Sequence, residues 1–317
     1  MSGIGEAPTI IASSWGDGLS VVRDGEVRRG FGGLRVAGLA SDGDGGAYAI
    51  VGEAEVWAWS PRRDWRLVMS GDGSLVCCLE LGGRMLAGTD DARVLELFDG
   101  GWGPLTGFDA TPGRENWYAG SAVIDGQVVG PPLGIRSMTK TCDEGALLVN
   151  VHVGGIPRST DSGVTWWPTI DIDADVHQVA AHPSRAGIVA AASGAGLCVS
   201  RDGGLSWSIT TDGLHASYCS AVALTETDLY LGTSTDHFAA QGSVYRRRID
   251  AQGPPERVGG GLPAWLDGIV DSHCIAVRGD DLAIVDGGGS LYVSRDGGDS
   301  WSLRADGLPS PSGVLIC

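Results

Sequence analysis

Short runs of apolar residues, separated by glycine and polar residues, recur along the whole chain. They are clearest in the middle, where residues 177–182, 188–192, 197–201 and 206–210 each form such a run. Within a run, apolar positions alternate with polar ones or follow one another briefly, which is typical of β-strands. The pattern therefore predicts a unit of four short strands joined by tight turns.

The same unit repeats on both sides of this region. Upstream units are predicted at 34–68, 75–105 and 135–169, and downstream units at 219–259 and 273–304. A repeat of about 40–50 residues that contains four strands is typical of the blades of a β-propeller. Together with the unit at 177–210, these units predict six complete blades.

The two ends of the chain hold the remaining strands. Residues 9–13, 19–22 and 27–30 predict three strands without an inner partner, and residues 313–317 predict a single strand. If the last strand pairs with the first, they complete a further blade and protect its edges. We therefore predict an all-β fold in which 1–317 is one domain, a seven-bladed β-propeller closed by pairing of its N- and C-terminal strands. Blades are numbered along the chain from this composite first blade.

The connection between the third and fourth blades, residues 108–134, is longer than any other. Long connections in compact domains are often functional. In a propeller, one face carries the connections into the inner strands and the turns between second and third strands; it is defined here as the top face. We predict that 108–134 is a top-face insertion, which either contributes to a site or only packs on its own blade.

Three turns share the pattern S-x-D-x-G-x-[ST]-W, at residues 159–166, 200–207 and 294–301. In such a turn the Ser and Asp side chains accept hydrogen bonds from nearby backbone N–H groups, Gly adopts a positive φ, and Trp packs beneath. The pattern resembles the Asp-box, or BNR repeat, of the sialidase-like β-propeller families. This resemblance implies a structural motif that closes the hairpin between the third and fourth strands of a blade.

Residues 152–159, followed by 175–179, look like the bacterial sialidase-like repeat proteins of seven blades. The resemblance covers most of the chain and implies the fold, together with the label of a glycosyl hydrolase. True sialidases require an Arg triad, a Tyr nucleophile with a Glu partner, and an Arg-Ile-Pro motif near the N-terminus. This chain has Ile-Pro-Arg at 156–158 and offers Arg114 and Arg136 on its top-face loops, without an evident triad. We therefore do not expect a true sialidase.

The histidines gather on the top face. Five of the six fall at turns between second and third strands or at connections into inner strands: His152, His177, His215, His237 and His273. Only His182 falls on the opposite face. A chance grouping remains the alternative, because half of all loops lie on the top face.

Aligning the inner strands of the fifth and seventh blades places His177 and His273 at the same position, where each strand enters the central channel. Asp175 precedes His177 closely, and Tyr218 opens the inner strand of the sixth blade. We predict that His177 and His273 face one polar cavity, with His152 at its wall.

Two chemistries fit such a cavity. His152, His177 and His273 are candidate ligands for a divalent metal (Zn, Fe, Cu or Ni), since these ions bind neutral imidazole. Alternatively, the cavity transfers protons, because imidazole changes charge near neutral pH. The candidate catalytic residues are His177, His273, Asp175 and Tyr218. No other cofactor is expected.

The charge and the cysteine content of the chain limit which partners and which cellular compartment are expected. The formal net charge of −17 disfavours nucleic acid and anionic membranes as partners. No run of ~18 apolar residues would span a membrane, and the first residues lack the basic and apolar regions of a secretion signal. The seven Cys are an odd number without a disulfide pattern, so we expect buried thiols and a cytoplasmic protein.

Two functions remain open. The first is a small-molecule enzyme, a hydrolase or lyase, with its site at the mouth of the central channel and a small molecule or glycan as substrate. The alternative is a non-catalytic scaffold that binds a protein or a glycan across the top face. The enzyme requires its histidines for turnover, whereas the scaffold tolerates the loss of any one of them.

Overall fold

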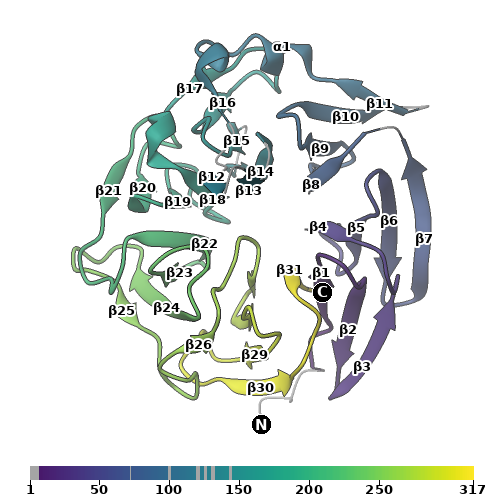
Figure 1. Cartoon of the computed structure of the whole chain (residues 1–317), viewed down its shortest axis with the longest axis vertical. Coiled ribbons are helices and arrows are strands. Elements are labelled where there is room, and N and C mark those ends of the chain that lie inside the picture. The colour runs from purple at the N-terminus through teal and green to yellow at the C-terminus, as the bar shows by residue number, and fades with distance from the viewer. Residues whose placement is uncertain are drawn as a thin grey trace.

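The structure is a computed structural model that describes residues 7–71, 73–98, 101–118, 122–124, 127–129, 133–142 and 145–317. Seven antiparallel sheets lie around a central axis as the blades of a propeller (Figure 1). Each has four strands in the described residues, and the sixth blade has a further strand, β26 (Leu266–Asp267). The predicted seven-bladed β-propeller is confirmed.

The strands follow the predicted ranges closely. The first blade holds β1 (Ile10–Ser14), β2 (Leu19–Arg23), β3 (Glu26–Gly30) and β31 (Pro311–Ile316), and the second β4 (Val36–Ser41), β5 (Ala47–Val51), β6 (Glu55–Ser60) and β7 (Arg63–Ser70). The third holds β8 (Leu75–Glu80), β9 (Met85–Thr89), β10 (Val94–Phe98) and β11 (Gly101–Pro104), and the fourth β14 (Ile135–Lys140), β15 (Leu147–Val151), β16 (Pro157–Ser159) and β17 (Trp167–Pro168). The fifth holds β18 (Val176–Ala181), β19 (Val189–Ser193), β20 (Gly196–Ser200) and β21 (Ser208–Thr210), and the sixth β22 (Tyr218–Leu224), β23 (Asp228–Ser234), β24 (Gln241–Arg248) and β25 (Glu256–Arg257). The seventh holds β27 (Ile275–Arg278), β28 (Asp281–Val285), β29 (Leu291–Ser294) and β30 (Ser302–Ala305).

The ends of the chain close the ring. β31 pairs antiparallel with β1, with Ile316 opposite Ile10 and Val314 opposite Ala12. Each inner strand contacts the next around the axis, and β31 contacts the inner strands β4 and β27 on either side. The predicted pairing of the N- and C-terminal strands is therefore confirmed.

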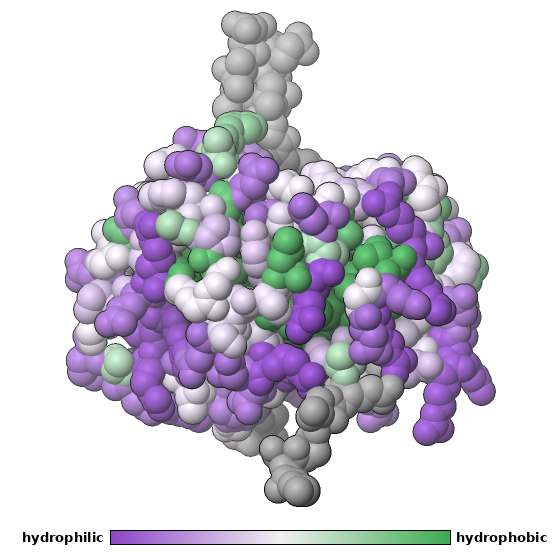
Figure 2. Space-filling view, turned by 90° about the horizontal axis from the view of Figure 1, so that it is seen from below, coloured by the Kyte–Doolittle hydropathy of each residue, from purple (hydrophilic) through white to green (hydrophobic). Residues whose placement is uncertain are grey.

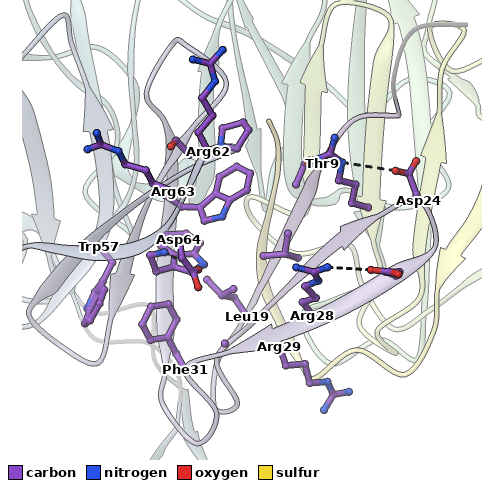
Figure 3. Close-up of a pocket in the computed structure, with 18 residues that line it drawn as sticks. Thr9, Leu19, Asp24, Arg28, Arg29, Phe31, Trp57, Arg62, Arg63 and Asp64 are labelled. Atoms are coloured by element: carbon purple, nitrogen blue, oxygen red, sulfur yellow. Dashed lines mark hydrogen bonds and ion pairs between the residues drawn. The ribbon is translucent and has the colours of Figure 1, made fainter.

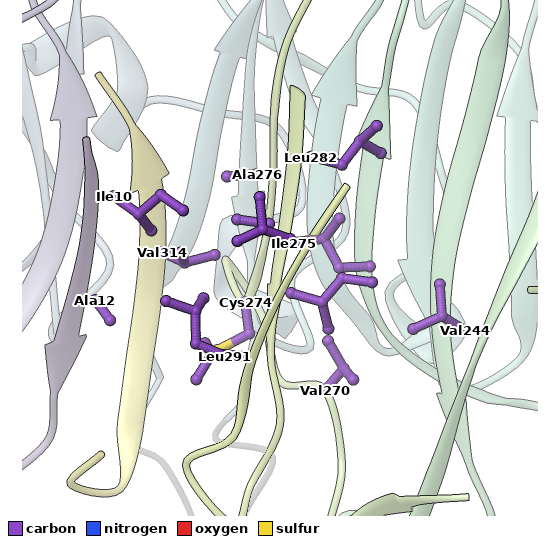
Figure 4. Packing of buried hydrophobic residues seen from close by; sticks show 14 of the residues in the cluster. Ile10, Ala12, Val244, Val270, Cys274, Ile275, Ala276, Leu282, Leu291 and Val314 are labelled. Carbon is purple, nitrogen blue, oxygen red and sulfur yellow. The ribbon is translucent and has the colours of Figure 1, made fainter. Parts of the chain in front are cut away.

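The hydrophobic core lies between neighbouring blades. One cluster joins the sixth, seventh and first blades (Figure 4) and includes Val244, Ile275, Leu291 and Val314. Strands of the inner half of a blade pack on both faces, and β15 and β19 are accordingly buried over their whole length. The outer wall seen in Figure 2 is mostly hydrophilic, with a hydrophobic area recessed in it.

Six inner strands carry one extra residue at the same point, close to where the strand meets the top of the channel. A β-bulge leaves the extra residue unpaired and re-aims its side chain. The residues at these bulges are Ala37, Val76, Arg136, His177, Ser220 and Ser312. Because all but Ser220 line the cavity at the channel mouth, the repeated bulge explains how the fold supplies side chains to it.

The three S-x-D-x-G-x-[ST]-W turns share one hydrogen-bond network. In the last of them, Gly298 N donates to Ser294 Oγ at 2.8 Å, and Ser300 N donates to Asp296 Oδ1 at 2.9 Å. The other two turns repeat both contacts. Trp301 is buried beneath its turn, whereas the Trp of the middle turn is only half-buried. These contacts are local, so the motif fixes hairpins between third and fourth strands.

Acid is expected to weaken the protein through these turns. Hydroxyl and backbone donors lower the pKa of Asp161, Asp202 and Asp296 from 3.8 to about 2. Since the folded pKa is depressed, each carboxylate contributes stability above the unfolded pKa, and this is lost as the pH falls from about 3.8 to about 2. Replacing all three with Asn should flatten the fall of the thermal midpoint in this window. Parallel profiles for both proteins would contradict the assignment.

The connection between the third and fourth blades begins at the rim. α1 (Thr106–Asp109) places Phe108 edge-on against Trp166, with ring centroids 5.1 Å apart, beneath a turn between third and fourth strands. Further on, Tyr118 N donates to the turn that follows β15. The predicted insertion 108–134 therefore lies away from the top face at Phe108 and contacts a turn of the top face at Tyr118. Parts of it lie outside the described residues, and a top-face role for the rest stays a prediction.

The described helices include none with the length and hydrophobicity to cross a membrane. All seven Cys are free thiols, and six are buried. Burial raises the pKa of the Cys77 and Cys219 thiols to about 12, so both stay protonated near neutral pH. They behave as small apolar side chains, as the composition predicts.

Candidate functional site

A cavity of about 900 Å³ lies at the mouth of the central channel. Residues from all seven blades line it, because the inner strands converge on the axis. The predicted site residues are all among them: His152, Asp175, His177, Tyr218 and His273. The structure thus brings these residues to one cavity, although it does not bring all of them into contact.

Three of these side chains form one compact group, defined here as the His–Asp–His cluster. His152 Nε2 lies 3.3 Å from Asp175 Oδ1, and His177 Nε2 lies 3.4 Å from Asp175 Oδ2. His152 and His177 are only 5% and 3% exposed. One carboxylate therefore lies between two buried imidazole nitrogens, and all three potential ligand atoms are within 4.8 Å of one another.

The backbone fixes each member of the cluster. His177 occupies the bulge of β18, and His152 lies in the turn that follows β15. That turn closes at Gly155, whose φ of 74° and close neighbours exclude a side chain. Asp175 has a φ of 51°, which is uncommon outside glycine, and its carbonyl accepts from Gly194 N at 2.9 Å. Unusual backbone conformations of this kind cluster at functional sites.

The hydrogen bond of His177 Nδ1, the ring nitrogen that faces away from Asp175, decides which tautomer the ring adopts. Nδ1 lies 2.6 Å from the carbonyl oxygen of Cys219, which only accepts hydrogen bonds, so Nδ1 carries a proton. In the neutral ring, Nε2 then presents a lone pair to the Asp175 carboxylate. Two acceptors face each other, and a proton or a cation must lie between them.

His152 and Asp175 also carry polar atoms that lack a hydrogen-bond donor or acceptor opposite them in the described part of the chain. His152 Nδ1 is buried and has no hydrogen-bond partner among the described residues. Burial lowers the pKa of His152, with Asp175 partly opposing it, which favours the neutral ring. Asp175 Oδ1 is likewise buried and accepts no hydrogen bond from the described residues. Burial by itself would raise the pKa of Asp175, but the neighbouring imidazoles of His152 and His177 lower it more strongly and hold it well below its usual range. Near neutral pH the cluster is therefore built around a charged carboxylate.

The spacing of the cluster fits a shared metal ion. Zn²⁺ binds imidazole nitrogen and carboxylate oxygen at about 2.0–2.2 Å, so neighbouring ligand atoms of a tetrahedral site lie about 3.3–3.6 Å apart. The separations of 3.3 and 3.4 Å fall in this range, and each ends on a different oxygen of Asp175. A backbone carbonyl that holds the outer nitrogen of a His is also typical of metal ligands. Two His and one carboxylate suit Zn²⁺ or Fe²⁺.

Tyr218 lies beside the cluster. Its ring centroid is 4.6 Å from that of His177, and its hydroxyl lies 3.5 Å from His237 Nδ1. Burial, followed by the charges of Asp271 and Asp175, raises the pKa of Tyr218 well above its usual range. The hydroxyl therefore stays protonated near neutral pH and can donate a hydrogen bond to a molecule in the cavity.

His273 lines the same cavity but lies outside the cluster. Its Nε2 lies 2.8 Å from the carbonyl oxygen of Arg136, and its backbone has a φ of 65°. The expected set of three His is therefore not assembled: Asp175, rather than His273, joins His152 and His177. The prediction relied on the matching positions of His177 and His273 in their inner strands. It did not hold for His273, because its left-handed backbone and its contact with the carbonyl of Arg136 turn the ring away from the cluster.

The remaining top-face histidines divide between two environments. His237 lines the cavity, as expected from its turn. His215 instead packs against Tyr245 and Trp265, with ring centroids 5.9 and 4.9 Å away, and does not line the cavity. On the other face, His182 accepts a backbone N–H through Nδ1 and is buried as a structural residue.

Two contributors to the site could not be assigned from the sequence. The carbonyl of Cys219 orients His177, and a backbone group has no sequence signal of its own. Arg136 was placed on the top face without a role, yet it occupies the bulge of β14 and lines the cavity. Its guanidinium makes no hydrogen bond or ion pair with the described residues. Aligning the inner strands and comparing the residues at the bulge position could have identified Arg136 as a residue of the cavity.

No protein-family model matches the sequence, and no curated protein matches it. Solved structures do match. A GH74 xyloglucanase from Xanthomonas campestris aligns over 94% of this chain and 47% of its own, at 16% identity and a TM-score of 0.60. The WD40 β-propeller domain of Doa1 aligns over 95% of this chain and 86% of its own, at 13% identity and a TM-score of 0.60. YCF48, solved bound to a D1 peptide, aligns over 88% and 91%, at 14% identity and a TM-score of 0.56.

At these identities the similarity shows the fold alone. This chain spans about half the length of the xyloglucanase chain. The similar structures include a glycoside hydrolase and a protein bound to a peptide, so the fold does not choose between catalysis and binding. By its architecture, this chain is a seven-bladed β-propeller.

Proposed function

We propose that this protein is a metal-dependent enzyme, of hydrolase or lyase type, that acts on a small polar molecule in the channel cavity. The observation that carries the proposal is the Asp175 carboxylate between two buried imidazole nitrogens, one of which faces it with a lone pair. A divalent cation at this point would satisfy all three groups at once. Zn²⁺ and Fe²⁺ are the ions that this set of ligands favours.

His152, His177 and Asp175 would hold the ion. Such an ion polarises a carbonyl or phosphoryl oxygen, or lowers the pKa of a bound water. Tyr218 is placed to donate a hydrogen bond to negative charge on the reacting molecule. Arg136, whose guanidinium has no partner among the described residues, is placed to attract an anionic group.

The cavity favours a compact, polar substrate. Its volume of about 900 Å³ is within the range of small-ligand sites. Both signs of charge line it, as Arg35 and Arg136 share it with Glu53, Asp90 and Asp271. A small molecule with several polar groups, including a short glycan, matches such a lining.

A non-catalytic scaffold is the alternative function. Binding a protein or glycan across the top face requires no carboxylate held between two nearly buried imidazoles, and two facing acceptors cost free energy unless a proton or a cation lies between them. The cluster therefore favours the enzyme. The scaffold nevertheless predicts that loss of any single His leaves binding on the top face intact.

Turnover after metal removal and reconstitution tests the proposal. Chelator-treated protein should be inactive on a panel of model esters, amides, phosphate esters and glycosides, and should regain activity toward one class with Zn²⁺ or Fe²⁺. His177→Ala should not regain it, whereas His182→Ala, a buried His away from the cavity, should. Metal binding without turnover of any class would favour the scaffold.

A further inference from the structure

A second cavity, of about 1000 Å³, lies between the first and second blades and shares no lining residue with the channel cavity. One wall is the face of β2 and β3 that carries Leu19 and Arg28. The other wall is the face of β6 and β7 that carries Trp57, labelled in Figure 3, and also Trp65. This cavity is defined here as the side groove.

On the wall formed by the first blade, one position facing the side groove is a glycine, so no side chain occupies that part of the groove. Gly30 lies opposite Leu19 on the wall formed by the first blade. A Cβ atom at Gly30 would meet only Leu19 Cδ1, at 3.7 Å, and the backbone of Gly30 is outside the left-handed region. The position therefore accepts a side chain without backbone strain, and a large side chain there would project into the groove beside Leu19.

The floor of the side groove is aromatic. Phe31 packs edge-on against Trp57 and Trp65, with ring centroids 5.0 and 5.6 Å apart. All three rings are half-buried. Edge-to-face packing presents notches between rings rather than one flat platform. Such notches suit a single bulky side chain better than the flat face of a sugar ring.

The rim of the side groove is basic, although the whole chain has a net charge of −17. Five Arg and three carboxylate residues line the groove: Arg23, Arg28, Arg29, Arg62, Arg63, Asp24, Glu26 and Asp64. Arg28 pairs with Glu26 at 3.4 Å. In contrast, the side chains of Arg62 and Arg63, at the hairpin between β6 and β7, make no hydrogen bond or ion pair with the described residues. Two guanidinium groups without a partner in the described part of the chain therefore border an aromatic floor (Figure 3).

We propose that the side groove binds a short acidic peptide segment in extended conformation. One bulky apolar side chain of the peptide lies on the aromatic floor, and its carboxylates pair with Arg62 and Arg63. β3 is the outermost strand of its sheet and has no strand on its outer side among the described residues, so a peptide backbone can pair there. An oligosaccharide has no such pairing. This role is independent of the chemistry proposed for the channel.

Selection from a random linear peptide display library tests the proposal. The full-length protein is the bait, and Gly30→Trp, which places a bulky side chain in the groove, is the counter-selection bait. Enriched peptides are synthesised, and their affinities are measured by fluorescence polarisation. We expect them to share acidic residues beside a bulky apolar residue. Each should bind Gly30→Trp and the double variant Arg62→Ala/Arg63→Ala about tenfold or more weakly than wild type, and binding should weaken with salt.

Two controls separate the groove from other surfaces. Arg304→Ala removes an exposed Arg from the outer strand of the seventh blade and should leave peptide affinity unchanged. His177→Ala should also leave it unchanged, which separates this proposal from the one for the channel. Three outcomes would overturn the proposal: no enrichment, enriched peptides that bind Gly30→Trp as well as wild type, or an anionic oligosaccharide that binds through Arg62 and Arg63 where peptides do not. Because Arg62 and Arg63 are exposed, their variant remains informative even if Gly30→Trp folds poorly.

Discussion

Removing residues 312–317 is expected to abolish the cooperative unfolding transition. These residues form most of β31, the inner strand of the first blade, and they carry the buried side chains of Val314 and Ile316. Ser312 Oγ also donates to the carbonyl of Val36 at 2.5 Å, which ties the last strand to the second blade. Without β31 the ring is open, and the edges of β1 and of its neighbours are exposed. Differential scanning calorimetry should show a broad or absent transition, with aggregation.

A point substitution provides a milder form of the same test. Val314→Asp places a charge in the core and should lower the free energy of unfolding by about 3–5 kcal/mol. Leu303→Asp, on the outer strand β30, is the matched control, because Leu303 is 52% exposed, and it should change stability little. A truncated protein with an unchanged melting temperature would contradict closure of the ring by β31.

Asp175→Asn is expected to have opposite effects on the metal-free and the metal-bound protein. In the metal-free protein, the amide can donate to His177 Nε2, so two facing acceptors become a donor and an acceptor, and stability should rise by about 1 kcal/mol. Asn also tolerates the left-handed backbone at this position. Zinc affinity should fall by at least about 100-fold, since a metal ligand is lost.

Thermal unfolding with and without zinc measures both effects. Wild type should gain stability with zinc, and Asp175→Asn should not. If the variant is less stable than wild type without metal, a proton rather than a cation lies between His177 and Asp175, and the cluster is an ion pair. His182→Asn serves as the control for a change at a buried His away from the cavity.

The fold was predictable because its signals are local. Short apolar runs mark the strands, and the three S-x-D-x-G-x-[ST]-W turns mark hairpins that hold themselves together through contacts within eight residues, as from Ser294 to Trp301. The closing strand was predictable because six blades were already complete. Residues 313–317 could then pair only with the three remaining strands at the N-terminus.

The candidate site was predictable only in part. Loop position placed His152, His177 and Asp175 on one face, but their contact depends on backbone features that residue spacing does not show. Asp175 turns into the cluster through a φ of 51°, whereas a similar conformation at His273 turns its ring away from the cluster. The side groove had no sequence signal, because its walls come from strands of two blades and its opening depends on Gly30.

Anomalous diffraction from crystals grown with zinc tests the central claim most directly. The site proposed here predicts one anomalous peak at the zinc edge, about 2.0–2.2 Å from His152 Nε2, His177 Nε2 and an oxygen of Asp175. Crystals of His177→Ala grown in the same way should lose this peak. A wild-type map without density between Asp175 and the two imidazoles, at a zinc concentration that saturates binding in solution, would contradict the metal site.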